Sequence, residues 1–198
     1  LFYESAGFGI LYWNELMNEF KLIDYIKNRS AARINVSRSN KIIKGIGDDT
    51  AVVKTDGNTQ LLITTDSLIE NVHFSLKTTD LYNLGYKSVI VNVSDILSKG
   101  GNPKYLLGSI NIPAHLKNIK RFIDGVNDCC EKYNIKIIGG DTTSSKNDFC
   151  ISITLIGETS KKTVFRNGSL KENSLICMTG YAGLSGAGFY ALNDTAIV

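Results

Sequence analysis

Hydrophobic positions recur along the chain with two different periods, and each change of period predicts a change between strand and helix. Five short apolar runs predict strands, at 50–54, 60–64, 105–112, 135–138 and 149–157. Apolar residues three and four positions apart predict helices over 79–99, with Thr79 as the N-cap, and over 113–133. The sequence DGN at 56–58 predicts a hairpin between the first two strands.

Each of the two helices carries an apolar stripe that predicts its buried face. The first stripe comprises Tyr86, Val89, Ile90, Val93, Ile96 and Leu97, and the second comprises Ile119, Phe122, Ile123 and Val126. The opposite face of the first helix carries Asn92, Asp95 and Lys99. An exposed Asp95–Lys99 pair, four residues apart, explains this face without any function, while a functional Asp95 explains it equally well.

The order strand, strand, helix, strand, helix, strand, strand predicts an α/β layer structure with helices on one face of a mixed sheet. We expect one domain over 17–158, and over 159–198 a linking segment, a strand at 174–179 and a glycine-rich turn opening a helix, which would begin a second, truncated domain. Residues 1–16 are aromatic and apolar without the basic start of a signal peptide, and Met17 opens an amphipathic helix. We therefore interpret Met17 as the natural start and 1–16 as a non-native or upstream extension.

Composition narrows the class of function. The chain of 198 residues is 43% hydrophobic and 21% charged, with a net charge of +3 and scattered lysines, which argues against nucleic acid as the main partner. The four cysteines form no C-x-x-C pair and there are only two histidines, so we do not expect a structural zinc site. We expect the cysteines to be reduced thiols in a cytoplasmic protein. No G-x-S-x-G elbow is present for a serine nucleophile.

The aspartates are the most informative feature, because Asp48, Asp49, Asp66 and Asp141 all follow predicted strands. Carboxylates at several strand ends of one sheet can converge on one edge, where they repel one another unless a cation is bound. Magnesium prefers such oxygen ligands together with substrate phosphates. The alternative is that each aspartate only decorates a turn, where this residue is common.

Other candidate positions are open to two interpretations each. Gly139-Gly140 allows close approach of the backbone to a phosphate, or forms a plain turn. The glycines at 180–188 place helix N-terminal amides near a phosphate, or pack a helix closely. His73 is a catalytic residue, or a structural or surface one, and Arg166 is a phosphate clamp or a surface residue.

Taken together, the motifs resemble thiamine-monophosphate kinase. The resemblance is carried by GIGDD at 45–49, TTDSLIENVHF at 64–74, KSVIVNVSD at 87–95, GGNP at 100–103, GGDTT at 139–143 and RNG at 166–168. The block from TTD to VHF is the most specific of these. It separates this kinase from fold relatives such as aminoimidazole ribonucleotide synthetase, selenophosphate synthetase and the hydrogenase maturation protein that dehydrates a carbamoyl group.

The resemblance implies an aminoimidazole ribonucleotide synthetase-like (PurM-like) domain with a four-stranded mixed sheet, and a cytoplasmic homodimer formed through these sheets. It implies that the protein transfers the γ-phosphoryl group of ATP to thiamine monophosphate. The transfer would depend on positioning and charge, without a catalytic side chain. It implies magnesium ligands at Asp49, Thr64, Thr65, Asp66, Asp95 and Asp141. It also implies ATP contacts at Gly140, Asp141 and Arg166, and a thiamine phosphate contact at His73. Leu184 stands where the family usually carries an acidic residue.

Two alternatives stay open beside this assignment. One is another PurM-like ATP-dependent enzyme acting on a different acceptor. The other is a non-catalytic fragment that only binds ligand or dimerises.

Overall fold

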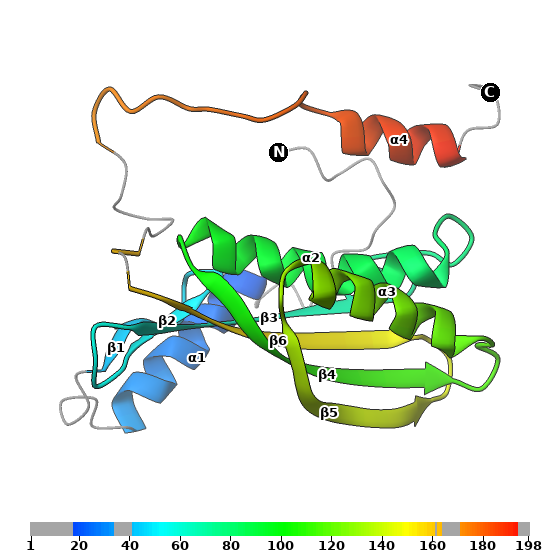
Figure 1. Ribbon diagram of the computed structural model, residues 1–198, viewed down its shortest axis with the longest axis horizontal. Coiled ribbons are helices and arrows are strands. Elements are labelled where there is room, and N and C mark those ends of the chain that lie inside the picture. Colours follow the sequence, from blue (N-terminus) through cyan, green and yellow to red (C-terminus); the bar gives the residue numbers. More distant parts are fainter. Residues whose placement is uncertain (1–17, 34–40, 161, 164–170, 194–198) are drawn as a thin grey trace.

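The computed structural model describes residues 18–33, 41–160, 162–163 and 171–193, and six of its strands form one sheet covered on one face by two helices (Figure 1). The elements are α1 (Glu19–Arg33), β1 (Ile42–Lys44), β2 (Ala51–Lys54), β3 (Gln60–Ile69), α2 (Leu81–Ser98), β4 (Asn102–Pro113), α3 (Ile119–Lys132), β5 (Lys136–Ser145), β6 (Cys150–Thr159) and α4 (Leu184–Asn193). The predicted α/β class is therefore confirmed.

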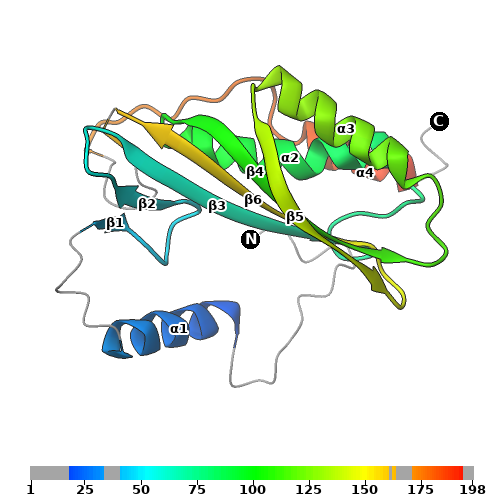
Figure 2. The same ribbon diagram turned by 60° about the horizontal axis from the view of Figure 1, so that its bottom comes forward.

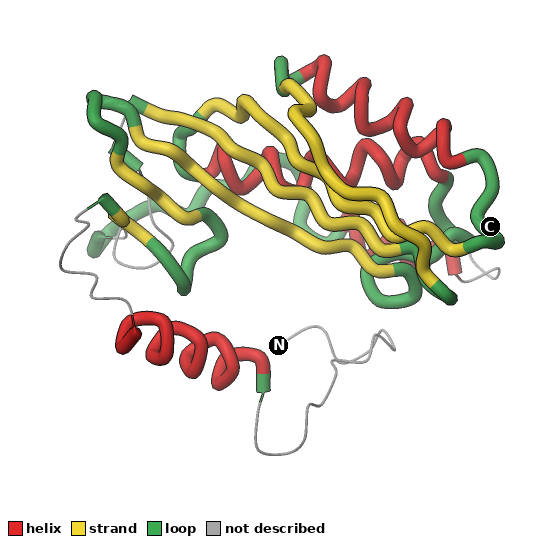
Figure 3. The backbone as a smooth tube through the Cα atoms, turned by 90° about the horizontal axis from the view of Figure 1, so that it is seen from below, coloured by secondary structure: helices red, strands yellow, loops and turns green. Residues whose placement is uncertain are grey.

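The sheet is mixed and has the strand order β1-β2-β3-β6-β4-β5, so the prediction of four strands was too low by two. The β4–β5 pair is parallel and the other pairs are antiparallel. The predicted hairpin is confirmed, since Lys54 pairs with Gln60 across the turn at 56–58. The strand predicted at 50–54 is β2, and β1, which no apolar run in the sequence analysis predicted, extends the sheet beyond it at one edge. Figure 3 shows the twist of the strands from the face turned away from α2 and α3.

The two covering helices pack so closely that glycine is required where they touch. A Cβ atom added at Gly85 of α2 would lie 2.0 Å from the Phe122 carbonyl oxygen, and one added at Gly125 of α3 would lie 2.0 Å from the Tyr82 carbonyl oxygen. The paired glycines bring the backbones of α2 and α3 into contact above the sheet. Beneath them lies one core, whose largest fully buried side chains include Leu62, Leu84, Val89, Val93, Ile96, Leu106, Phe122, Phe149, Ile151 and Leu155.

The helix boundaries differ from the sequence predictions for local reasons. Asp80, rather than Thr79, caps α2, and its carboxylate accepts a hydrogen bond from the Asn83 backbone N–H over 3.0 Å. The α3 helix begins at Ile119 and not near Pro113, because Pro113 still belongs to β4. Asn118, with φ 60°, makes the turn between them.

The polar face predicted for α2 is partly wrong. Asn92 is fully buried and Lys99 is only 4% exposed, whereas Leu97, assigned to the apolar stripe, is half exposed. Lys99 forms its ion pair with Asp48 on the loop before β2, so the predicted exposed Asp95–Lys99 pair is not what holds this lysine. A contact between residues so far apart along the chain cannot be inferred from helical spacing.

Two helices stand outside the layers, as Figures 1 and 2 show for α4 and α1. The helix predicted after Met17 is confirmed as α1, where the Asn18 side chain accepts the Lys21 N–H over 3.0 Å, and the helix predicted after the glycine-rich turn is confirmed as α4. The strand predicted at 174–179 is absent, because no described strand pairs with this segment. Its Ile176 is 97% exposed.

No helix in the described part of the chain combines the length and apolar character needed to cross a membrane. Residues 1–17 lie outside the described ranges, and with them the predicted upstream extension. The division into domains at 158 and 159 stays a prediction.

Candidate functional site

An acidic group lies where β3 passes under the C-terminal half of α2. The Thr64 hydroxyl oxygen is 2.8 Å from the Asp95 carboxylate and 2.9 Å from the Asp49 carbonyl oxygen, and its single proton is shared between these two acceptors. Thr64 is buried on the helix-covered face of β3, in line with buried Leu62 and Leu68. One hydroxyl therefore holds together the loop before β2, the strand β3 and the helix α2.

The carboxylates of this group influence one another through their charges. Burial raises the pKa of Asp66, and the negative charge of Asp49 raises it further, whereas His73 lowers it. Burial also raises the pKa of Asp95, where the Thr64 hydrogen bond opposes the shift and the charges of Asp66 and Asp49 add to it. The negative charge of Asp49 thus reaches both Asp66 and Asp95, and that of Asp66 reaches Asp95, as expected of carboxylates that lie near one another.

The loop that carries Asp49 is fixed to the end of α2 by buried contacts. Asp48 forms an ion pair with Lys99, and its side chain is completely buried. Thr50, also completely buried, directs its hydroxyl to the Asp95 carbonyl oxygen at 3.4 Å. The two consecutive aspartates therefore differ: Asp48 turns to Lys99, while Asp49 belongs to the acidic group around Thr64.

The strands are longer than their apolar runs indicated, so Asp66 is not at a strand end as expected. It lies within β3 and pairs with Ile153 of β6. Thr65 is adjacent in sequence, and successive side chains of a strand point to opposite faces. Thr65 accordingly lies on the uncovered face, where its hydroxyl accepts a hydrogen bond from Thr154 over 3.1 Å. The structure therefore brings Asp66 and Thr64 together but directs the Thr65 side chain away from them.

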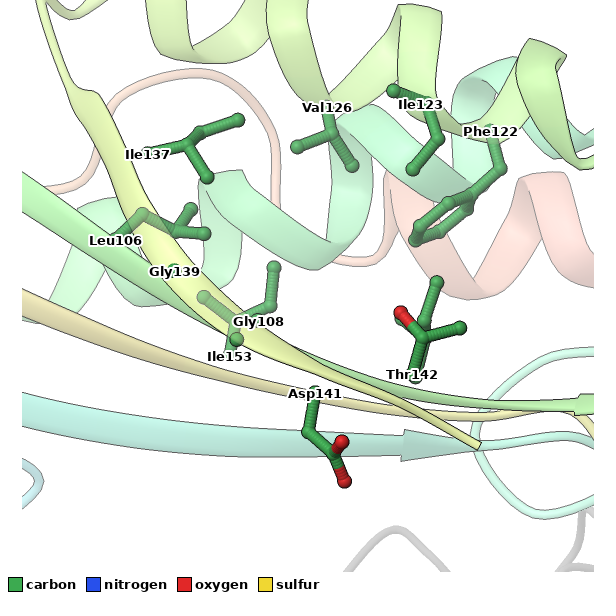
Figure 4. Close-up of a pocket in the computed structure, with 12 residues that line it drawn as sticks. Leu106, Gly108, Phe122, Ile123, Val126, Ile137, Gly139, Asp141, Thr142 and Ile153 are labelled. Carbon is green, nitrogen blue, oxygen red and sulfur yellow. The ribbon is translucent and has the colours of Figure 1, made fainter. Parts of the chain in front are cut away.

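Asp141 is separated from the acidic group. It lies within β5, not at a strand end, because β5 continues through the two glycines to Ser145. From β3 to β5 the sheet order counts three strand spacings, which is roughly 14 Å. Asp141 is level with Ser109 and its carboxylate points away from α3 in Figure 4, to the uncovered face. The predicted magnesium ligands are thus divided between the two faces of the sheet.

A pocket of about 350 Å³ lies between α3 and the strands β4 and β5 (Figure 4). Its walls are mainly apolar, with Phe122, Ile123 and Val126 from α3 facing Gly139 and Gly140 of β5. A Cβ atom added at Gly140 would lie 1.8 Å from the Gly108 carbonyl oxygen, so no side chain fits there. The volume of the pocket is within the range of small-molecule binding sites.

His73 lies beyond the end of β3 with its ring orientation fixed. Its Nδ1 accepts a hydrogen bond from the Ile69 backbone N–H over 3.1 Å. Because that nitrogen accepts, the ring proton is on Nε2 in this arrangement. The Lys87 ammonium of α2 donates to the His73 carbonyl oxygen over 3.4 Å, which adds a cation that the sequence interpretation did not assign to the site.

The remaining site residues differ in what the structure says of them. Arg166, the predicted phosphate clamp, lies outside the described residues. Within the described ranges, no three His, Cys, Asp or Glu side chains form a group able to hold a metal ion by themselves. The sequence interpretation missed Lys99 as the partner of Asp48 in the loop that presents Asp49, because Lys99 was assigned to an exposed face. Its position one turn after Asp95 was the available signal.

The sequence and fold of this chain are similar to those of known proteins. The model of the family described as AIR synthase related protein, N-terminal domain, matches residues 47–159. Thiamine-monophosphate kinase of Bacillus subtilis is 34% identical over 178 residues, which are 89% of this chain and 53% of that protein. Thiamine-monophosphate kinase of Aquifex aeolicus is 38% identical over 178 residues, with 89% and 53% covered. The chain thus spans about half the length of these curated relatives.

Solved structures give the same result. A structure described as AaThiL complexed with AMPPCP and TMP has a TM-score of 0.64 and 39% identity, covering 77% of this chain and 45% of that one. A protein of Thermus thermophilus, tt0281, shares the fold with a TM-score of 0.59 at 17% identity, covering 76% and 47%. The resemblance found in the motifs is confirmed. The chain therefore belongs to the AIR synthase related protein family, whose N-terminal domain it contains, and the curated relatives reported above are thiamine-monophosphate kinases.

Proposed function

We propose that this chain is part of a thiamine-monophosphate kinase, which transfers the γ-phosphoryl group of ATP to thiamine monophosphate and forms thiamine diphosphate. The observation that carries the proposal is the acidic group of Asp49, Asp66 and Asp95 around Thr64, in a chain that is 34% identical to a thiamine-monophosphate kinase. The similar structure described with AMPPCP, an ATP analogue, and TMP supports both ligands.

The residues fit a hard cation in their donor chemistry. Asp49, Thr64, Asp66 and Asp95 offer only oxygen atoms. Burial raises the pKa values of Asp66 and Asp95, and neighbouring negative charge, which a cation would neutralise, raises them further. Magnesium is usually bound through one or two carboxylates plus waters and substrate phosphates, so an all-protein cage is not needed. Bound magnesium would neutralise the charge on the transferred phosphoryl group.

We therefore propose Asp49, Thr64, Asp66 and Asp95 as magnesium ligands, and Thr65 and Asp141 as further ligands on the other face of the sheet. Donor and acceptor are both anionic, so their mutual repulsion is a large part of the barrier. The chain's own contribution is to fix the positions of its carboxylates through the bonds of Thr64. We propose direct in-line transfer with several magnesium ions and no phosphorylated side chain.

The ATP contacts proposed at Gly140 and Asp141 are supported by the pocket between α3 and β5. β5 is the last strand of the sheet, so a ligand at its edge can reach the pocket on one side and the Asp141 carboxylate on the other. Arg166 stays proposed from the motif alone. For His73, the fixed Nε2–H is a donor suited to a phosphate oxygen of thiamine monophosphate, and Lys87 adds a nearby positive charge.

We also propose a homodimer formed through the uncovered faces of the sheets. That face carries exposed Tyr105 and Leu107 on β4, together with a row of hydroxyl groups including Ser67 and Ser152, whose oxygens are 2.6 Å apart. Apolar side chains left on one face of a sheet favour a covering partner. All four cysteines are free, which supports the proposed cytoplasmic location.

The experiment that tests the function measures binding and turnover on the same preparation. Isothermal titration with AMPPCP and Mg²⁺ reports nucleotide binding, and chromatography reports thiamine diphosphate formed from ATP and thiamine monophosphate. Product from thiamine monophosphate supports the kinase, while product from a different acceptor alone supports another enzyme of the same fold.

A non-catalytic binding fragment is the second candidate, since the chain spans about half of its relatives' length. Magnesium-dependent AMPPCP binding without any product would support it.

A further inference from the structure

A buried ion pair joins the end of α2 to the loop that carries Asp49. Lys99 is 4% exposed, and the Asp48 side chain that it contacts is completely buried. Lysine and aspartate are almost never buried to this extent unless they are paired. Removing two charges from water is costly, so a buried ion pair often adds little to the stability of the fold. The Lys99–Asp48 pair therefore needs an explanation other than stability.

The position of the pair relative to the acidic group provides that reason. Asp48 and Asp49 are consecutive, and Lys99 follows Asp95 by one helical turn on α2. The loop is therefore held at two adjacent points: Asp48 by the Lys99 ammonium, and the Asp49 carbonyl by the Thr64 hydroxyl. Thr50 adds a third contact, to the carbonyl of Asp95.

We propose that Lys99 is a positioning residue for the metal site: by holding Asp48 in the interior, it fixes the loop so that Asp49 faces the cation shared with Asp66 and Asp95. The inference rests on the proposed function, since it concerns the same metal. It gives the two neighbouring aspartates separate roles, with Asp48 as the buried counter-ion of Lys99 and Asp49 as the ligand.

A purely structural pair and a positioning pair differ in what they do to metal affinity. If the pair only stabilises the fold, its replacement lowers the unfolding temperature and leaves the affinity of the folded chain unchanged. If it positions Asp49, the affinity falls even in a fully folded variant. Loss of a group that orients a metal ligand typically lowers affinity by about 10-fold to 100-fold.

The test uses the double variant K99M/D48N of the 198-residue chain, which removes one positive and one negative charge together. The net charge beside the acidic group stays the same. The Lys99 charge, which lowers the pKa of Asp95, is lost in K99M/D48N and in K99Q/D48N alike, so a difference in affinity between these two variants reports the position of the loop. Mn²⁺ replaces Mg²⁺ as the probe, and electron paramagnetic resonance counts free and bound ions. We expect an affinity at least about tenfold weaker than that of the unaltered chain.

The matched control is K104M/E158Q. It removes a salt bridge of 3.1 Å whose side chains are 40% and 45% exposed, again without changing the net charge. We expect its Mn²⁺ affinity to equal that of the unaltered chain. A rescue variant, K99Q/D48N, restores a hydrogen-bonding pair at the same place. We expect it to recover part of the lost Mn²⁺ affinity. We also expect it to fold even if K99M/D48N does not.

Each result decides the matter. Weaker binding by K99M/D48N with recovery in K99Q/D48N supports the role of Lys99. Unchanged affinity in a folded K99M/D48N overturns that role alone, and so does an equal loss of affinity in K99M/D48N and in the control K104M/E158Q. Failure of the unaltered chain to bind Mn²⁺ overturns the proposed metal site, and this inference with it.

Discussion

The Thr64 hydroxyl of β3 donates a hydrogen bond to the Asp95 carboxylate of α2 over 2.8 Å, across 31 residues of sequence. The same hydroxyl is 2.9 Å from the Asp49 carbonyl oxygen. Strand, helix and loop therefore meet at one buried oxygen atom. This arrangement places the acidic group on the helix-covered face of the sheet.

Thr64→Val tests the importance of this hydroxyl, because valine keeps the shape but removes the donor. The Asp95 carboxylate and the Asp49 carbonyl would each lose a partner, and we expect a loss of about 1–3 kcal/mol in the free energy of unfolding. The Thr64 bond holds the pKa of Asp95 down, so the variant should also bind Mn²⁺ more weakly at pH 6. Urea unfolding and Mn²⁺ titration measure the two effects. Thr154→Val, on the uncovered face, is the control, with an expected change within about 0.5 kcal/mol.

Asp66→Asn removes one charge of the acidic group and changes little volume. We expect Mg²⁺-dependent AMPPCP binding to weaken by on the order of tenfold or more, while the circular dichroism spectrum stays the same. Isothermal titration checks the affinity. Asp56→Asn is the matched control, because Asp56 is exposed and pairs only at the surface with Lys41. Equal nucleotide affinity in Asp66→Asn and Asp56→Asn would remove Asp66 from the site.

The raised pKa values of Asp66 and Asp95 predict opposite pH trends with and without metal. In the metal-free chain both groups bind protons more readily when folded than when unfolded. Their contribution to stability therefore increases as the pH falls from neutral through their raised folded pKa values toward the ordinary aspartate value. With Mn²⁺ bound the trend reverses, because protonation displaces the cation.

Thermal unfolding with EDTA and with Mn²⁺, over a series of pH values from 7 down to about 4, measures these trends. The double variant D66N/D95N should lose both. A metal-free pH dependence that is identical in the variant and in the unaltered chain would contradict the assignment.

Gly85→Ala tests the contact between α2 and α3. The added methyl would lie 2.0 Å from the Phe122 carbonyl oxygen, so the helices must move apart. We expect a loss of about 1–3 kcal/mol in the free energy of unfolding, despite the better helix propensity of alanine. Gly57→Ala has nothing within 4 Å of the added atom and serves as the control. Urea unfolding that shows equal stabilities would rule out the close helix contact.

The cysteines should differ in reactivity. Burial raises the pKa of Cys129 and of Cys130 to about 11, so few thiolates form there at neutral pH. Cys177 is exposed. We expect Ellman's reagent to modify Cys177 at once in the native chain, and Cys129 and Cys130 only after addition of guanidinium. The variant Cys177→Ser should lose the fast phase, and rapid reaction of all thiols without denaturant would contradict the buried positions.

The sequence predicted the parts of the fold that depend on neighbouring residues. The hairpin at 56–58 and the burial of Val89, Val93 and Phe122 follow from turn chemistry and helical spacing, and all are found. The extent of β3 could not be predicted in this way. Its polar segment at 65–67 is extended only because β6 pairs with it residue by residue.

The site shows the same limit more sharply. The grouping of Asp49, Asp66 and Asp95 was expected from the motifs, and the structure brings them together. The separation of Asp141 from this group depends on the order of the strands in the sheet, because β6 and β4 lie between β3 and β5. This order is set by the packing of the whole sheet. The pairing of Lys99 with Asp48 is also a tertiary contact, and the helical pattern alone favoured the wrong partner.

The position of β5 at the border of the sheet has a consequence for handling the molecule. Along its outer side no described strand takes up the backbone N–H and C=O groups, and exposed Ile137 and Ile138 accompany them. Such a border is a template on which another extended segment can add. We therefore expect concentrated solutions of the isolated chain to aggregate through this edge.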